Sequence, residues 1–324
     1  MKYFIFTLGC QMNTSDSERI ATILNQKGYC SSNEKSADLI VINACSVRQK
    51  AVDRIWGGIK KWQTQHKKII LTGCVLPDDQ GKMAEKGVLY TDFHDNYFFE
   101  ITPELSSDTS FIPIMSGCDN FCSYCAVPYT RGREKSRPVS KIIAEVKIAL
   151  KKRRKKILLL GQNVNSYKYG FAKLLKKIDN IPGDFEFNFI SSNPHDMTDE
   201  IVSTFSKLKK WPRELHLAMQ SGNDEILKRM NRKYTSGQFL KLVQALKSYI
   251  PDLMITTDII VGFPGETKKQ FEDTVKICKK IGFSKAYVSQ YSPRPGTVAA
   301  KLKDDIPADE KKKRWKILNN LINQ

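Results

Sequence analysis

Three cysteines in the middle of the chain have a spacing that suits an iron–sulfur cluster. They are Cys118, Cys122 and Cys125, arranged as Cys-x3-Cys-x2-Cys. A [4Fe–4S] cluster takes one thiolate per iron, so three cysteines would leave the fourth iron open to a ligand that is not protein. An open iron indicates chemistry on a bound molecule, whereas a fully ligated cluster would indicate a structural role or electron transfer.

The alternative for these three cysteines is a zinc site or a chance grouping. Zinc usually takes two Cys-x2-Cys pairs, or one pair together with histidines. No histidine lies between His94 and His195, so the sequence offers zinc no nearby fourth ligand. We therefore expect a cluster at this position.

Three more cysteines are spread over the first part of the chain, and each follows a short run typical of a β-strand. The runs are Tyr3–Thr7, Leu39–Asn43 and Ile69–Thr72, and the cysteines are Cys10, Cys45 and Cys74. Because the carboxyl ends of parallel strands meet at one sheet edge, these thiols should converge there as a second three-cysteine cluster site. The alternative is three unrelated buried thiols. Cys30 and Cys278 lack such placement and are interpreted as ordinary structural cysteines.

The residues around the cysteines resemble a known family. The first spacing is that of radical S-adenosylmethionine (AdoMet) enzymes, and Gly117–Pro138 (GCDNFCSYCAVPYTRGREKSRP) resembles their methylthiotransferase branch. Three further stretches resemble the MiaB type of tRNA methylthiotransferase: TLGCQMNTSDSE (Thr7–Glu18), NACSVRQKA (Asn43–Ala51) and TGC (Thr72–Cys74). The group acting on threonylcarbamoyladenosine usually has Lys-Val-Asn after the first cysteine, and the group acting on a ribosomal-protein aspartate has Pro-Lys-Asn. Here Gln11-Met12-Asn13 follows it, and the resemblance covers almost the whole chain.

The resemblance implies a reaction and its cofactors. These are two [4Fe–4S] clusters and AdoMet, with the six cysteines as metal ligands and catalytic centre. The implied reaction converts N6-isopentenyladenosine at position 37 of tRNA, beside the anticodon, to its 2-methylthio form. One AdoMet would supply a methyl group, and a second would yield the radical that takes hydrogen from C2 of the adenine. Alternatives are methylthiolation of threonylcarbamoyladenosine or of a protein aspartate, and a non-catalytic RNA-binding iron–sulfur protein.

Short polar and glycine-containing motifs after successive predicted strands are expected to bind AdoMet. The family places its AdoMet contacts there, and glycine lets a backbone approach a ligand closely. Tyr124, just before the last cluster cysteine, would pack beside the adenine, or simply under its own loop. The expected AdoMet-binding residues are Tyr124, Gly161, Gln162, Asn163, Ser191, Gln220, Ser221 and Gly262.

The basic residues are unevenly distributed. Residues 1–110 hold 13 Lys and Arg against 13 Asp and Glu, so the net charge of +19 belongs entirely to residues 111–324. Such an excess favours a polyanionic partner, and RNA is the expected one. Arg131, Arg133 and Arg137 follow the cluster loop and are expected to contact RNA, because a guanidinium binds phosphate with two hydrogen bonds. The run Lys151–Lys156 is either a further contact or a solvated helix end.

The predicted elements describe an α/β protein with two domains. Residues 1–104 are expected to form an open parallel α/β domain, with helices over Ser15–Lys27 and Val47–Gln65. Residues 105–324 are expected to form a partial (β/α)6 radical AdoMet barrel and a basic helix from Ala308. Its strands are predicted at Phe111–Met115, Ile157–Leu160, Glu186–Ile190, Leu215–Leu217, Met254–Ile260 and Lys285–Gln290. Residues 75–110 lack a clear pattern and look shorter than the family's corresponding segment.

The remaining expectations concern partners and location. No stretch approaches the 18 apolar residues of a membrane span, and the short apolar start does not suit a secretory signal, so we expect a cytoplasmic protein. An electron donor such as flavodoxin or ferredoxin is implied, and a monomer is expected. The family usually continues into a small β-barrel, the TRAM domain, which helps to hold tRNA and which this sequence does not contain. His195 and His216 are expected to be packing residues, since a radical reaction needs no acid–base histidine.

Overall fold

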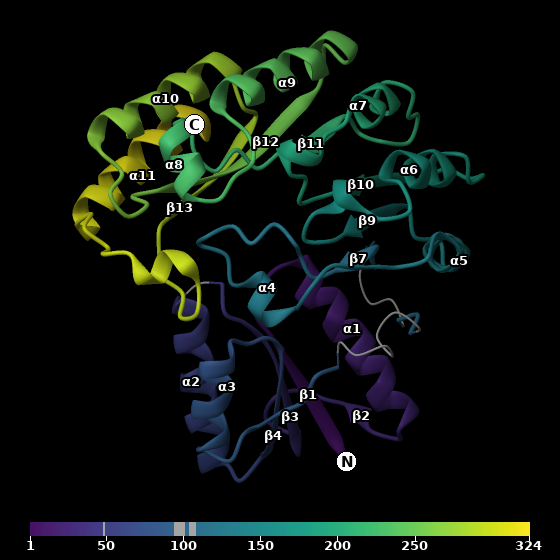
Figure 1. Cartoon of the computed structure of the whole chain (residues 1–324). Coiled ribbons are helices and arrows are strands. Elements are labelled where there is room, and N and C mark those ends of the chain that lie inside the picture. The colour runs from purple at the N-terminus through teal and green to yellow at the C-terminus, as the bar shows by residue number, and fades with distance from the viewer. Residues whose placement is uncertain (48, 94–100, 104–107) are drawn as a thin grey trace.

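A five-stranded parallel sheet forms the first part of the computed structural model, which describes residues 1–47, 49–93, 101–103 and 108–324 (Figure 1). Its strand order is β2-β1-β3-β4-β5. The strands are β1 (Lys2–Thr7), β2 (Cys30–Ser31), β3 (Leu39–Cys45), β4 (Lys68–Cys74) and β5 (Leu89–Tyr90). The three predicted strands are confirmed, and β3 and β4 extend far enough to include Cys45 and Cys74.

Three helices cover the two faces of this sheet. They are α1 (Gln11–Gln26), α2 (Gln49–Thr64) and α3 (Pro77–Ala84). Ile20 and Leu24 of α1 pack with Val41 on one face, whereas Ile55 and Trp62 of α2 belong to the apolar cluster on the other. The segment without a clear pattern thus contains α3 and β5. A two-residue strand and an eight-residue helix are too short to show a period in sequence.

The second part contains six parallel strands in two three-stranded sheets. Their orders are β10-β9-β6 and β11-β12-β13, and a parallel bridge between Ser192 and Leu217 links the two sheets. The strands are β6 (Thr109–Pro113), β9 (Lys156–Leu160), β10 (Glu186–Phe189), β11 (Glu214–His216), β12 (Met254–Val261) and β13 (Lys285–Gln290). The curved six-stranded wall confirms the predicted partial barrel.

Helices follow the barrel strands and pack on the outside of the wall (Figure 1). They are α5 (Val139–Lys151), α6 (Phe171–Asp179), α7 (Asp199–Phe205), α8 (Asp224–Arg229), α9 (Ser236–Tyr249), α10 (Lys268–Ile281) and α11 (Ala308–Ile322), with the short α4 (Val127–Thr130) and the 3-10 turns η1 (Val164–Ser166), η2 (Pro194–Asp196) and η3 (Val298–Lys301). One continuous apolar core joins these helices to the strands, with Phe189 stacked against Trp211.

The first predicted barrel strand is divided in two. The sequence predicts it over Phe111–Met115, but β6 ends at Pro113, and Met115 pairs instead in the antiparallel ribbon of β7 (Met115–Ser116) and β8 (Lys135–Ser136). The proline has no N–H for a ladder hydrogen bond, which is a reason for the strand to end there. The division turns the chain toward the cysteine loop that follows β7.

The two parts pack directly on each other. The Ser15 hydroxyl of α1 donates to the Phe111 carbonyl of β6 at 3.0 Å, and Arg19 of α1 forms an ion pair with Glu145 of α5 at 2.6 Å. Glu145 also binds Arg137, and all three side chains are buried. The expected domain boundary between residues 104 and 105 lies outside the described residues.

Candidate functional site

The three cysteines of the first domain converge at one edge of its sheet. Cys45 and Cys74 are paired residues at the last positions of β3 and β4. Cys10 is the N-cap residue of α1 and follows Gly9, where an added Cβ would lie only 2.9 Å from the Cβ of Cys45. Glycine is therefore needed for this approach, and its φ of +126° is also in the region that favours glycine. The predicted convergence of Cys10, Cys45 and Cys74 is confirmed.

Two buried asparagines fix the turn that carries Cys10. Asn13 donates to the Asn43 side chain at 3.0 Å and to the Ala44 carbonyl at 2.9 Å. Asn43 donates in return to the Asn13 carbonyl at 2.7 Å. These bonds hold the start of α1 against the end of β3. Burial raises the pKa of the Cys74 thiol to about 11, and the neighbouring Cys45 and Cys10 contribute to the rise against the opposing effect of Arg131.

The central cysteines occupy a loop that is fastened on both sides. Gly117 opens it with a φ of +79°, and a Cβ there would lie 2.1 Å from the Arg133 carbonyl oxygen. Ser123 is bound by Met230, whose carbonyl accepts from its N–H at 3.0 Å. Burial raises the pKa of the Cys125 thiol to about 12, and Cys122 and Cys118 raise it further, as expected for thiols held near one another. The loop places Cys118, Cys122 and Cys125 together.

Both triads suit clusters better than single metal ions. Among the described residues, no three His, Cys, Asp or Glu side chains gather closely enough to hold one ion. A four-iron cluster takes one thiolate per iron, so its cysteines need not meet at one point. All eight cysteines are free thiols, so none of the six is lost to a disulfide. The residues present fit two clusters.

Buried polar atoms without partners lie beyond the ends of successive barrel strands. The side-chain oxygens Gln162 Oε1, Asn163 Oδ1, Ser192 Oγ and Gln220 Oε1 have no hydrogen-bond partner in the part of the chain that the structure describes. Leaving such an atom unpaired costs about 1–3 kcal/mol. Ser191 and Gln220 also have φ of +70° and +64°, strained values that tend to occur at functional sites. These acceptors fit the ammonium and hydroxyl donors of AdoMet.

Three other predicted AdoMet residues have internal packing partners. A Cβ on Gly161 would lie 2.6 Å from Met115 Cγ, and one on Gly262 would lie 2.4 Å from Lys311 Cγ. The Ser221 hydroxyl is fully buried and lies 3.3 Å from the Thr274 hydroxyl. Packing inside the protein is therefore enough to explain these residue types. Binding of AdoMet by these three stays a prediction.

Tyr124 lies in the cysteine loop against an apolar cluster that includes Phe263 and Tyr291. Beside it is Arg232, which sequence reasoning missed. Arg232 donates to Cys122 Sγ at 3.4 Å and to Asn193 Oδ1 at 2.8 Å, so it connects the cluster loop to the loop after β10. It is an ordinary basic residue in a basic stretch, and no sequence signal distinguishes it from its neighbours.

Two of the three arginines expected to contact RNA lie inside the protein. Arg137 is 2% exposed and is bound to Glu145, and the Arg131 side chain is bound to Asp16. A guanidinium already paired with a buried carboxylate is not available to phosphate, so the expectation of RNA contact is wrong for these two. Arg133 is 70% exposed and lies 3.0 Å from Asp119, so contact with RNA stays a prediction for it.

The basic run Lys151–Lys156 lies away from the cysteines. It connects the end of α5 to the first residue of β9, whereas the cluster loop and the unpaired oxygens follow the carboxyl ends of strands. Arg154 and Lys155 also form exposed ion pairs with Asp108 and Asp184, at 3.4 and 2.7 Å. This position favours the solvated helix end over an RNA contact near the centre.

Arg131 connects the two triads across the domain junction. It follows α4, the short helix after the central cysteines, and α4 lies between the barrel and the first sheet (Figure 1). Its Nε donates to Cys74 Sγ at 2.8 Å. The two cysteine groups thus lie on adjoining sides of one junction.

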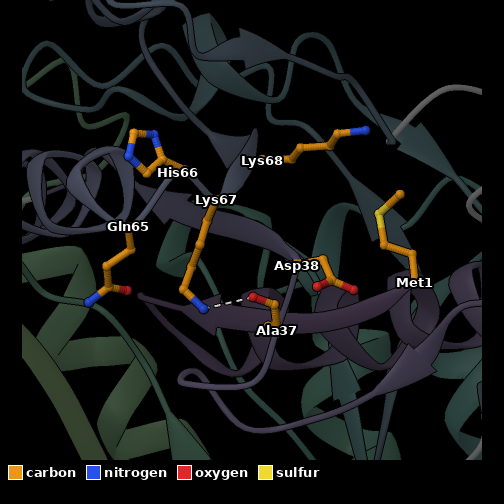
Figure 2. A pocket seen from close by; sticks show the side chains of 7 residues that line it. All are labelled: Met1, Ala37, Asp38, Gln65, His66, Lys67 and Lys68. Carbon is orange, nitrogen blue, oxygen red and sulfur yellow. Dashed lines mark hydrogen bonds between the residues drawn. The ribbon is translucent and has the colours of Figure 1, made fainter.

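The hollow drawn in Figure 2 belongs to a different part of the molecule. It is lined by Met1, Ala37, Asp38, Gln65, His66, Lys67 and Lys68, at the amino ends of β1, β3 and β4. The Lys67 ammonium donates to the carbonyls of Glu34, Lys35 and Ala37 at 2.7–2.9 Å, so its charge serves the local fold. Because the cysteines lie at the carboxyl ends of these strands, this hollow is not part of the candidate site.

Comparison with known proteins matches both parts of the chain. Residues 112–278 match the radical SAM (AdoMet) superfamily, and residues 2–92 match the uncharacterized protein family UPF0004. The tRNA-2-methylthio-N(6)-dimethylallyladenosine synthase of Clostridium botulinum strain Hall is 37% identical over all of this chain and 82% of its own length. The chain belongs to the radical SAM methylthiotransferase family. Enzymes with the same name from Clostridium novyi and Endomicrobium trichonymphae are 38% and 39% identical.

As a member of this family, the protein is an enzyme that uses AdoMet and [4Fe–4S] clusters. The alignment to the Clostridium botulinum enzyme spans 367 positions against 324 residues here, so the relative has insertions that this methylthiotransferase lacks. No helix in the described ranges has the length and apolar character to cross a bilayer.

Solved structures support the fold of this methylthiotransferase. The radical AdoMet methyltransferase TsrM of Kitasatospora setae matches with a TM-score of 0.67 at 11% identity, covering 92% of this chain and 74% of that one. The cobalamin-dependent radical enzyme OxsB matches with a TM-score of 0.60 at 11% identity, covering 98% and 55%. At such low identity the likeness concerns the arrangement of first domain and barrel alone.

Proposed function

We propose that the protein converts N6-isopentenyladenosine, also called dimethylallyladenosine, at position 37 of tRNA to its 2-methylthio form. The observation that carries the proposal is the pair of cysteine triads on adjoining sides of one junction, joined by the contact of Arg131 with Cys74. The names of the most similar relatives support this nucleoside over threonylcarbamoyladenosine or a protein aspartate.

The six cysteines divide between two roles. Cys118, Cys122 and Cys125 would hold the cluster at which AdoMet binds, and the other three would hold the auxiliary cluster. When bound, the first supplies the electron that cleaves AdoMet and the second the sulfur that is transferred. A radical can reach its target only if the two are held at a fixed separation, which the fastened junction provides.

The barrel loops would orient AdoMet. Gln162, Asn163, Ser192 and Gln220 offer buried acceptors without partners, and their fixed positions would select one pose of the ammonium and ribose groups. Tyr124 is half-buried beside Cys122, and desolvation raises its pKa well above the usual range, so it stays a neutral ring surface for the adenine. Ser191 would contribute through its strained backbone, next to the buried Ser192.

The partners of the reaction are inferred from the charge distribution of the chain and from the family to which it belongs. The anticodon stem-loop of tRNA would contact the positively charged second part, with Arg133 as an exposed candidate. Flavodoxin or ferredoxin would supply electrons in the cytoplasm, with the protein acting as a monomer.

The test is anaerobic turnover with reconstituted protein, followed by mass analysis of nucleosides from the tRNA. The substrate is tRNA carrying isopentenyladenosine, and the matched control is the same tRNA lacking the isopentenyl group. We expect 2-methylthio-N6-isopentenyladenosine only from the first, with 5′-deoxyadenosine formed alongside. A product only with threonylcarbamoyl-tRNA or a ribosomal protein would replace the proposed substrate. Absence of 5′-deoxyadenosine from fully loaded protein would favour the non-catalytic RNA-binding alternative.

A further inference from the structure

The guanidinium of Arg131 comes from the barrel and ends inside the first domain. Its Nε donates to Cys74 Sγ at 2.8 Å, and its Nη2 donates to Asp16 Oδ2 at 2.6 Å. The exposed fractions of the two charged side chains are 2% and 0%. One residue therefore contacts a predicted auxiliary-cluster ligand and an acidic side chain of α1 at the same time.

Arg131 remains charged in this position. A guanidinium is not deprotonated in proteins, and the Asp16 carboxylate at 2.6 Å balances its charge. Its Nη1 is buried and has no partner among the described residues. Cys74 and Asp16 thus leave both N–H groups of Nη1 without a partner among the described residues. A cluster at this edge of the sheet would offer thiolate and sulfide acceptors to which these N–H groups could donate.

We propose that Arg131 is a positioning residue for the auxiliary cluster, acting through its charged hydrogen bond to Cys74 Sγ and raising the reduction potential of that cluster. The physical reason is that reduction adds negative charge, which a buried cation and an N–H donor to a ligand sulfur both stabilise. Because Arg131 follows the central cysteine loop, the same contact fixes the distance between the two cluster sites. The inference rests on the auxiliary cluster of the proposed function.

The experiment isolates that cluster first. In a background with Cys118, Cys122 and Cys125 all replaced by alanine, only the first-domain cluster can assemble. Arg131→Met keeps an unbranched apolar side chain and removes the charge and the N–H donors. Arg131→Lys keeps the charge but loses the planar guanidinium that donates to Cys74 and Asp16 at once. Arg133→Met is the matched control, since Arg133 is an exposed arginine of the same loop. The readout is the midpoint potential from a redox titration followed by electron paramagnetic resonance.

We expect Arg131→Met to lower the reduced-to-oxidised ratio at the parent midpoint about tenfold, which is a shift of about 59 mV for a one-electron couple. Arg131→Lys should give a smaller shift, and Arg133→Met should stay within about twofold of the parent. Equal midpoints for Arg131→Met and Arg133→Met at full iron content would overturn the proposal. Absence of a cluster in the parent background would instead contradict the proposed function.

Circular dichroism and iron content are measured on the same samples, to detect a variant that does not fold or does not hold its cluster. Loss of iron from folded Arg131→Met with normal iron in Arg133→Met supports the proposal, because the cluster then depends on the arginine. Equal loss from both variants counts against it. If Arg131→Met does not fold, Arg131→Gln decides, because it removes the charge and keeps a polar side chain: a parent-like midpoint overturns the proposal and a lowered midpoint supports it.

Discussion

Cys45 and Cys122 belong to different triads, so their replacement separates the two predicted clusters. Cys122→Ala removes a ligand of the central loop, and we expect neither 5′-deoxyadenosine nor methylthiolated tRNA. Cys45→Ala leaves Cys118, Cys122 and Cys125 intact, so some 5′-deoxyadenosine should still form on reduction, without methylthio product. Cys30→Ala is the control, because Cys30 is an exposed thiol of β2 that belongs to neither triad. Chromatography of both products measures the outcome.

Normal methylthiolation by Cys45→Ala would remove that cysteine from the auxiliary site. Loss of 5′-deoxyadenosine in Cys45→Ala as well calls for iron content and circular dichroism, because cluster loss can also unfold the first domain. If that variant is folded and holds the iron of one cluster, the independence of the two sites is contradicted.

Cys278 gives a pH dependence that is separate from the clusters. Burial in α10 raises the pKa of this thiol to about 12, from about 9 when exposed. Between these values the unfolded chain releases a proton that the folded chain keeps, so its contribution to stability is complete below pH 9 and lost as pH rises toward 12. The stability advantage of wild type over Cys278→Ala should therefore shrink by about 1 kcal/mol per pH unit above 9. Urea unfolding of the cluster-free protein at pH 8, 9 and 10 measures it, and a constant advantage would contradict it.

The turn between β1 and α1 shows how an element constrains a site. Gly9→Ala would place a Cβ 2.6 Å from Asn13 Oδ1 and 2.9 Å from Cys45 Cβ, at a φ of +126°. Strain and overpacking should together cost about 2–5 kcal/mol and reduce iron binding by the first domain. Gly28→Ala is the matched control, because Gly28 also has a positive φ, +80°, but has open space around it. It should cost about 1 kcal/mol and leave iron binding unchanged.

Urea unfolding and iron content per chain measure both variants. Equal destabilisation by the two substitutions would show that backbone strain alone acts at Gly9. In that case the close approach to Cys45 would have no energetic importance.

The elements themselves were largely predictable, because alternating strands and helices carry strong local signals. The run Leu39–Cys45 is mostly apolar, contains three successive β-branched residues and is buried throughout, and the cysteine at its end indicated the site. Arg131 and Arg137 were misjudged, because local sequence does not reveal that Asp16 and Glu145, distant in sequence or on another element, lie inside the junction. Arg232 was missed because Cys122 and Asn193, which it contacts, lie far from it in sequence. Tertiary pairing of charges has no signature in spacing.

At the scale of the whole molecule, the net charge of +19 belongs to the second part, and tRNA binding should depend strongly on salt. With about four to six phosphates contacted, log K should fall with log salt at a slope of roughly −3 to −5. Replacing Lys151, Lys152 and Lys156 by alanine should change this slope little, because the run begins β9 at the end of the barrel away from the cysteines. Arg133→Ala should weaken binding to any tRNA and reduce the slope by about 1.

Filter binding or fluorescence anisotropy at low and at high salt would measure these slopes. A flat dependence for wild type would exclude the basic part as the RNA surface. A large loss on replacing the three lysines would show that the tRNA reaches around the barrel to its far end.

The carboxylate of Glu145 has two arginine partners, one from each side of the domain junction. Arg19 of the first half therefore has its buried carboxylate partner in the second half, where Arg137 also binds it. Separating the halves would leave Arg19 without its carboxylate partner and Glu145 with only one of its two arginines. Breaking a buried ion pair in this way costs several kcal/mol. Neither part can therefore be exchanged for an unrelated domain. A chimaera joined between the two parts should fold only if Arg19, Arg137 and Glu145 all come from the same parent protein.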